Sequence, residues 1–261
     1  EVSVAERNLL GRGQFAKASV QYGQRARGFE LSFVEPYLFD YRLAFGVDVF
    51  ARTVLPSAYQ SYEMRTAGGG FRFGIPITDQ ISLQARYSAY QREIGLDPLY
   101  NCYPGVTDPL TGVSSCIPAA PSLRQAADRG AVLTSLVGYT LAFNSLDNNK
   151  NPTKGIFAEL KQDFAGVGGD VNFIRTTGEV RGYYDVGWDI IAMFRGQAGH
   201  IASWGGQQLG MLDHFFMGPN LVRGFAPAGI GPRDLTLNST RDALGGTMYW
   251  GVTAELQYPL P

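Results

Sequence analysis

ISLQARYSAYQREI, residues 81–94, is the segment that indicates the fold of this chain most clearly. Its apolar residues Ile81, Leu83, Ala85, Tyr87 and Ala89 alternate with Ser82, Gln84, Arg86, Ser88 and Tyr90. Successive side chains of a β-strand point to opposite faces, so this period of two predicts a strand with one apolar and one more polar face.

The same alternation recurs along the chain, and we expect an all-β protein of about eleven strands. The predicted strands cover residues 2–7, 14–24, 29–35, 41–53, 62–75, 81–94, 131–144, 155–165, 171–184, 188–201 and 247–258. The strand at 62–75 contains Gly68, Gly69 and Gly70, three adjacent glycines that should soften or bend it. No helical stripe persists for three turns, and no run of about 18 apolar residues could form a transmembrane helix.

The length of the strands and the alternation of their connections favour an antiparallel transmembrane β-barrel. Strands of about 10 to 14 residues exceed the usual 5 or 6 and match the roughly 9 to 11 tilted residues that cross the hydrocarbon of a membrane. Longer connections at 95–130 and 203–246 alternate with short ones at 37–40, 76–79 and 185–187. A soluble sandwich gives the same apolar and polar faces, but these features together favour the barrel.

The predicted number of strands is odd, whereas bacterial single-chain barrels have an even number. A transmembrane sheet must also close, because unpaired backbone groups at an edge cost several kcal/mol each in lipid. Either one strand is miscounted or the chain is part of a longer protein.

Composition argues against two classes of function. The net charge is −1, and no basic cluster is present, so nucleic acid is not expected as a partner. The two histidines, His200 and His214, have no nucleophile or carboxylate at motif spacing, and we interpret both as structural or interfacial. We therefore expect no enzyme activity, no metal site and no cofactor.

Both cysteines, Cys102 and Cys116, lie in the loop at 95–130. Their spacing lacks the second ligand pair of a zinc site, and two cysteines that frame a loop rich in Pro, Gly and Ser favour a disulfide in an oxidising compartment. Free surface thiols are the alternative.

The long stretch from His214 to Gly246 has no sustained period of two or 3.6. Its many apolar residues argue against disorder, so we expect it to pack against another part of the molecule. Arg223 is the only charged residue between Asp213 and Arg233 and has apolar neighbours, so it should find a carboxylate and a cavity wall.

Within this stretch, GPNLVRGFAPAGIGPRD at 218–234, followed by ALGGTMYWGVTAELQYPLP, resembles the sixth external loop and following strand of the BamA family of outer-membrane protein assembly factors. NLLGRGQ at 8–14, LSFVEPYLFD at 31–40 and YTLAFNSLDNNKNPTKGIFAEL at 139–160 are similar to the turns and strands of that family in the same order. The resemblance covers essentially the whole chain, and the Val-Arg-Gly-Phe tetrad is its most specific motif.

The resemblance implies that residues 1–261 form a partial transmembrane barrel domain, a fragment of a sixteen-stranded barrel. It would hold strands two to twelve and lack the first strand, the last four strands and the periplasmic POTRA domains. We expect such a fragment not to close into a stable barrel alone, because both of its edges would be open.

The resemblance also implies that the loop folds into the barrel and that Arg223 meets Glu255 on the wall. The functional loop residues would be Val222, Arg223, Gly224 and Phe225. Arg223 could instead be a solvated charge, and Glu255 one of many polar residues of a barrel interior. We expect Phe225 to be a packing anchor, and Gly245 and Gly246 to let the chain turn back into the wall as a hinge.

The implied function is assembly and insertion of β-barrel proteins into the bacterial outer membrane, by templating of strands at a lateral seam. The implied partners are unfolded outer-membrane proteins, the lipid bilayer and, through the POTRA domains, the lipoproteins of the assembly complex. The alternatives are a passive outer-membrane porin and a related assembly factor or transporter, either TamA-like or of two-partner secretion.

Overall fold

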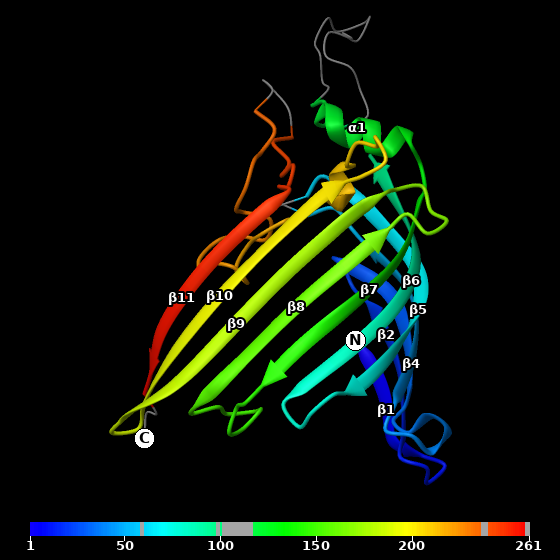
Figure 1. Ribbon diagram of the computed structural model, residues 1–261. Helices are drawn as coiled ribbons and strands as arrows, with labels where there is room; N and C mark the ends of the chain where they lie inside the picture. The colour runs from blue at the N-terminus through cyan, green and yellow to red at the C-terminus, as the bar shows by residue number, and fades with distance from the viewer. Residues whose placement is uncertain (58–59, 98–99, 101–116, 236–239, 259–261) are drawn as a thin grey trace, which may run out of the picture.

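Each strand of the chain pairs antiparallel with the strand that follows it, and the result is one sheet in the order β1 to β11. The computed structural model describes residues 1–57, 60–97, 100, 117–235 and 240–258 (Figure 1). The strands are β1 Val2–Leu9, β2 Gln14–Tyr22, β3 Ala26–Glu35, β4 Ala44–Val54, β5 Tyr62–Pro76, β6 Ile81–Leu96, β7 Val132–Asn144, β8 Gly155–Ala165, β9 Phe173–Gly187, β10 Ile190–Ser203 and β11 Met248–Gln257. Among these residues β1 and β11 do not pair with each other, so the sheet is open.

The prediction of eleven antiparallel strands is confirmed, although several boundaries differ by a few residues. β4 begins at Ala44 rather than at 41, because Leu38–Asp40 forms a short 3-10 helix, η1, in which Phe39 has a φ of 55°. β10 begins at Ile190 rather than at 188, because Trp188 and Asp189 both have a φ of 61° and form the hairpin turn. Positive φ at both central residues is the turn geometry that matches the twist of two antiparallel strands.

A short helix, α1 (Pro121–Asp128), lies within the loop at 95–130 and was not anticipated. It has eight residues, too few for a helical stripe of three turns, and begins with a proline at its first positions. Such a proline suits a helix start, because the backbone N–H groups there have no partner within the helix. Within the described part of the chain, no helix has the length and apolar character that crossing a membrane requires.

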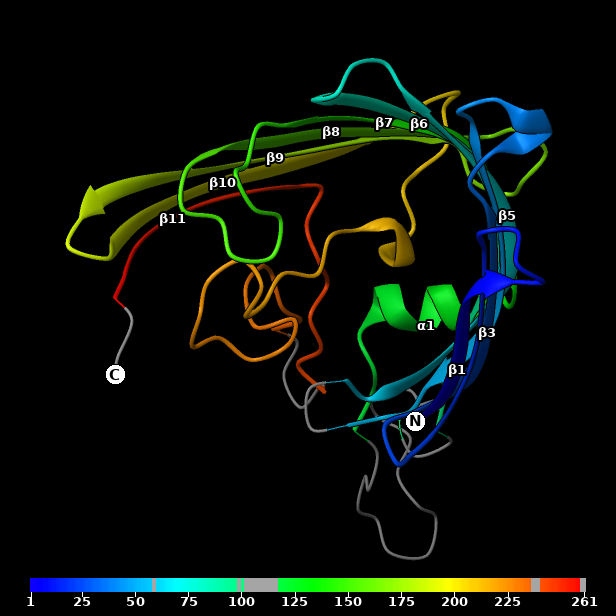
Figure 2. The same ribbon diagram turned by 90° about the horizontal axis from the view of Figure 1, so that it is seen from below.

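The sheet turns a sharp corner between β6 and β5, so that β6 to β11 and β1 to β5 form two arms around a concave side (Figure 2). The three glycines of β5 pair with Tyr90, Ala89 and Ser88 of β6. A Cβ atom added at Gly68 would collide with the Cβ of Tyr90, and one added at Gly70 would collide with the carbonyl oxygen of Tyr87. Glycine is therefore needed here for close approach of β5 to β6.

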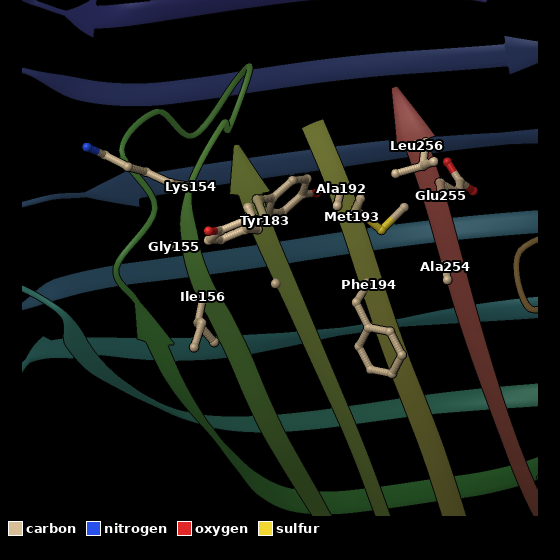
Figure 3. Close-up of a pocket in the computed structure, with 12 residues that line it drawn as sticks. Lys154, Gly155, Ile156, Tyr183, Ala192, Met193, Phe194, Ala254, Glu255 and Leu256 are labelled. Carbon is tan, nitrogen blue, oxygen red and sulfur yellow. The ribbon is translucent and has the colours of Figure 1, made fainter. Parts of the chain in front are cut away.

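The two faces of the sheet differ as the alternation predicts. The convex face carries exposed apolar side chains, such as Phe194 at 53% and Leu256 at 76% exposure. Between β8 and β11 this face is hollowed into a groove of about 740 Å³, where Ile156, Phe194 and Leu256 stand around small residues (Figure 3). An exposed apolar surface of this kind suits contact with lipid tails.

The connections are also sorted by length. The short turns at 77–80, 145–154 and 188–189 lie at the lower end of Figure 1, whereas α1 lies at the upper end. A buried apolar cluster, made of Tyr62, Ile94, Ala119, Ala120, Leu123 and Met211, joins α1, β5, β6 and the segment after β10. The two long connections therefore meet in a buried apolar cluster on the concave side.

Candidate functional site

The connection between β10 and β11, residues 204–247, is here called the inner loop. Its described residues, 204–235 and 240–247, lie on the concave side of the sheet (Figure 2) and include a short 3-10 helix, η2, at Met211–Asp213. Isolated bridges join Phe215 to Gly246 and Met217 to Ile230, so the loop forms a folded-back strip. The stretch without a strand period therefore packs inside the sheet.

The tip of the inner loop, residues 220–225, meets the wall through Arg223. Its Nη2 atom lies 3.0 Å from Oε1 and 3.1 Å from Oε2 of Glu255 on β11. The side chain of Glu255 is 19% exposed and that of Arg223 is 82% exposed. The structure thus brings together the two residues that the resemblance pairs, but Arg223 is far more exposed than its apolar neighbours led us to expect.

Of the other tetrad residues, Val222 and Phe225 are 43% and 49% exposed, and Gly224 has a φ of 90° that favours glycine. The buried apolar residue of the tip is Leu221, at 6% exposure. A Cβ atom added at Gly251 of β11 would lie 3.0 Å from the Cγ of Leu221, so the two residues are in close contact. The packing anchor that we expected at Phe225 is therefore at Leu221.

Two residues of β10 also hold the tip. Nη1 of Arg195 and Nε2 of Gln197 donate hydrogen bonds of 3.3 and 3.2 Å to the carbonyl oxygen of Asn220. Arg195 is itself oriented by Glu179 of β9, whose two carboxylate oxygens accept from its Nε and Nη2 at 3.0 and 3.1 Å. These residues were not singled out in the sequence, although alternation along residues 188–201 places Arg195 and Gln197 on the polar face.

A sheet of this kind with a Val-Arg-Gly-Phe loop inside it has known relatives. The family model described as the Omp85 superfamily domain matches residues 8–261. The chain belongs to the Omp85 superfamily. It is accordingly an outer-membrane protein domain, and its convex face is the side that contacts lipid.

Two relatives show how much of a longer protein this Omp85 chain resembles. It is 29% identical over 260 residues to "Outer membrane protein assembly factor BamA" of Neorickettsia risticii (strain Illinois), covering 99% of this chain and 32% of that protein. It is 25% identical over 256 residues to "Sorting and assembly machinery component 50 homolog" of Xenopus tropicalis, covering 97% of this chain and 49% of that protein. The chain thus spans about a third of the first relative and about half of the second.

A solved structure shares the fold. The structure of BamA from Haemophilus ducreyi lacking POTRA domains 1-3 has a TM-score of 0.77 with this Omp85 chain at 17% sequence identity. The match covers 99% of this chain and 50% of that one. The eleven strands are therefore part of the same kind of barrel.

The two glycines expected as a hinge lie where the ends of the inner loop pair. The backbone N–H groups of Phe215 and Gly246 donate to each other's carbonyl oxygens at 2.8 and 2.9 Å. Gly245 has a φ of 68°, and a Cβ atom there would lie 2.7 Å from the Cβ of His214. The Nδ1 atom of His214 lies 2.9 Å from the carbonyl oxygen of Leu244. Gly245 therefore makes room for a tight pairing of the two ends of the loop, whereas a Cβ at Gly246 would meet only an ordinary contact at 3.5 Å.

The return segment of the inner loop is attached to the opposite arm of the sheet. Asp242, 4% exposed, accepts the backbone N–H of Ser61 at 3.0 Å and also the hydroxyl groups of Ser61 and Thr240. Ser61 directly precedes β5. The inner loop of this Omp85 chain therefore bridges both arms.

Other predicted sites are placed as follows. Cys102 and Cys116, and with them the predicted disulfide, lie outside the described residues. In the part of the chain that the structure describes, no group of three His, Cys, Asp or Glu side chains is placed to hold a metal ion. His200 pairs with Met248 in the wall, and the ring of His214 lies against the carbonyl oxygen of Leu244 within the inner loop.

Proposed function

We propose that this chain is part of a factor that assembles and inserts β-barrel proteins into the bacterial outer membrane. The names of its relatives, an outer membrane protein assembly factor and a sorting and assembly machinery component, support this proposal. The observation that carries it is the contact at the tip, where Arg223 of the Val-Arg-Gly-Phe tetrad pairs with Glu255 on the inner face of β11.

In this proposal incoming strands are templated at a lateral seam of the barrel. An exposed sheet edge presents unpaired backbone N–H and C=O groups, to which an extended segment can add as a new strand. From β2 to β10 every strand is paired on both sides. An incoming strand can therefore pair only at an edge of the sheet and not along these strands. No covalent bond changes, and the activity consists of lowering the barrier to insertion.

The inner loop supports the wall while the seam opens. It contacts β10 through Arg195 and Gln197, β11 through Glu255, and the turn before β5 through Ser61. A strip that is attached to both arms resists their separation. Opening is then directed to the seam, where the sheet has no such attachment in this proposal.

The complete protein extends the chain in this proposal. The eleven strands correspond to strands two to twelve of a sixteen-stranded barrel, and POTRA domains precede the barrel. Unfolded outer-membrane proteins are the substrates, and lipoproteins of an assembly complex bind through the POTRA domains. The partial coverage of the relatives is consistent with this arrangement.

The test uses the full-length protein in liposomes and follows the folding of a reporter barrel protein. Arg223→Ala and Glu255→Ala are each expected to slow reporter assembly by about threefold to fivefold, which corresponds to about 0.7–1 kcal/mol in the barrier. The exchange Arg223→Glu with Glu255→Arg should restore part of the rate, because it recreates the ion pair. Heat-modifiable migration of each variant shows that the variant itself has folded.

Arg25→Ala is the matched control, because Arg25 lies in an exposed turn between β2 and β3, far from the loop in sequence. It should leave the assembly rate unchanged. If both Ala variants at the tip assembled the reporter at the rate of the unmodified protein, the proposal would fail. Unchanged assembly together with altered ion conductance would favour a passive porin.

A further inference from the structure

The base of the inner loop, residues 211–215, is held by a second ion pair that no motif indicated. Asp213 ends η2, and its carboxylate pairs with the guanidinium of Arg92 on β6. The side chains of Asp213 and Arg92 are 3% and 11% exposed. A charged pair this deeply buried requires further hydrogen bonds to be stable.

Asp213 has partners for all of its polar groups. Its Oδ2 atom accepts the backbone N–H of Gly210 at 3.3 Å, and its own N–H donates to the carbonyl oxygen of Gly210 at 2.9 Å. Its carbonyl oxygen accepts Nη2 of Arg175 on β9 at 2.8 Å. One residue therefore joins β6 and β9, which belong to different parts of the curved sheet.

The two arginines make further contacts that fix the same segment. Arg92 also donates to the carbonyl oxygen of Leu212 and, at 3.4 Å, to the hydroxyl of Thr134 on β7. The guanidinium of Arg175 lies over the rings of Phe173 and Phe215, at 4.9 and 5.6 Å from their centroids. Three strands thus converge on residues 212–215.

Apolar packing holds the other side of the base. Met211 is 5% exposed and belongs to the buried cluster that includes Leu123 of α1. The hydroxyl of Ser122 lies 3.9 Å from the sulfur of Met211. The base therefore has contacts on all sides, whereas the tip lies ten residues further along the chain at an exposed ion pair.

We propose that Asp213 is a positioning residue, which fixes the direction in which the inner loop crosses the concave side and so brings Arg223 to Glu255. The bridges at Phe215 to Gly246 and Met217 to Ile230 follow directly after Asp213 and carry that direction towards the tip. The position of the tip depends on Asp213 whatever the activity of the protein; its consequence for assembly rests on the proposed function.

The experiment measures the position of the tip directly in the full-length protein. Leu221→Cys and Gly251→Cys place two thiols at the contact between tip and β11 without altering Arg223 or Glu255, in a background where Cys102 and Cys116 are replaced by Ser. The rate of disulfide formation in the folded, heat-modifiable fraction reports how often the tip occupies its site. Reporter assembly is measured in parallel without the added cysteines.

Asp213→Asn is the test variant, since it preserves shape and removes the charge that faces Arg92. The rate of disulfide formation is expected to fall by about tenfold, because Arg92 loses its charged partner at the buried base. Glu93→Gln is the matched control: it removes a carboxylate from the adjacent residue of β6, where Glu93 is 45% exposed and pairs with Arg65 instead. The control should cross-link at the original rate.

Asp213→Asn combined with Arg92→Gln leaves no buried charge uncompensated and provides the same measurement if the single variant fails to fold. Slower cross-linking in either folded variant supports the positioning role, whereas an unchanged rate overturns it, because a merely structural role would lower the folded yield alone. Slower cross-linking with unchanged reporter assembly would support the positioning role and overturn the proposed function of the tip.

Discussion

The base and the tip of the inner loop are held by the same chemistry in opposite surroundings. Each has one arginine–carboxylate pair across elements that are distant in sequence, Arg92 with Asp213 at the base and Arg223 with Glu255 at the tip. The base pair is almost fully buried, whereas Arg223 is 82% exposed. Loss of one partner from a buried pair typically costs about 3–5 kcal/mol, but an exposed pair contributes only about 0.2–1 kcal/mol.

The difference teaches that one loop can combine a fixed and a reversible attachment. Burial makes the base pair part of the folded structure. Exposure leaves the tip pair weak enough to break and form again without unfolding.

The largest effect is expected from breaking the base. Arg92→Leu leaves the buried carboxylate of Asp213 without its partner and should destabilise the folded state by about 3–5 kcal/mol. Urea titration followed by heat-modifiable migration measures this change. A loss below about 1 kcal/mol, the range of a surface pair, would show that base and tip are equivalent.

A second comparison uses one glycine from each end. Gly245→Ala places a Cβ atom 2.7 Å from that of His214 at a φ of 68°, so strain and collision together should cost about 2–3 kcal/mol. Gly224→Ala at the tip meets no atom within 4 Å and should cost only about 1 kcal/mol for its φ of 90°. The same urea titration applies, and equal losses at the two sites would remove the contrast.

High salt should weaken the ion pair at the tip but not the buried pair at the base, so the stability of the fold should change little. The screening length falls from about 10 Å at 0.1 M to about 3 Å at 1 M salt, and buried pairs are screened much less. Cross-linking of Leu221→Cys with Gly251→Cys should therefore slow severalfold in 1 M NaCl, while the urea midpoint changes little. Insensitivity of the cross-linking rate to salt would mean that Leu221, and not the ion pair, holds the tip.

The smallest effect is expected at the exposed contact between Asp147 and Thr153, in the turn at 145–154. The hydroxyl of Thr153, with the backbone N–H groups of Lys154 and Thr153, lowers the pKa of Asp147 from 3.8 to about 2. Because the folded-state pKa is depressed, this contribution is complete above about pH 4 and is lost as the pH falls through 2.

Thr153→Ala should raise the pKa of Asp147 back towards its usual value, without affecting the inner loop. NMR titration of the Asp147 carboxyl group measures the shift, with Asp189, in the turn between β9 and β10, as an exposed reference. A pKa that stayed near 2 in this variant would assign the effect to the backbone N–H groups alone.

Local sequence determined the strands and their two faces. A period of two assigns each side chain to one face wherever a strand forms, so the polar face of β10, with Arg195 and Gln197, could be predicted from order alone. The pairing of Arg223 with Glu255 was implied by the resemblance of the loop to a known family, and Glu255 alternates with the exposed Ala254 and Leu256 of β11. The alternation is local, whereas the pairing of Arg223 with Glu255, 32 positions apart, was available only through the family resemblance.

Only the tertiary structure decided what holds the base. Arg92 and Asp213 are 121 positions apart, and Ser61 and Asp242 are 181 apart. No periodicity links residues at such separations; they meet because the sheet turns between β5 and β6 and brings its two arms to face each other. The alternation of residues determined which side chains point inward. The curvature of the sheet decided which of these side chains touch, because it is the sum of small rotations between many pairs of neighbouring strands.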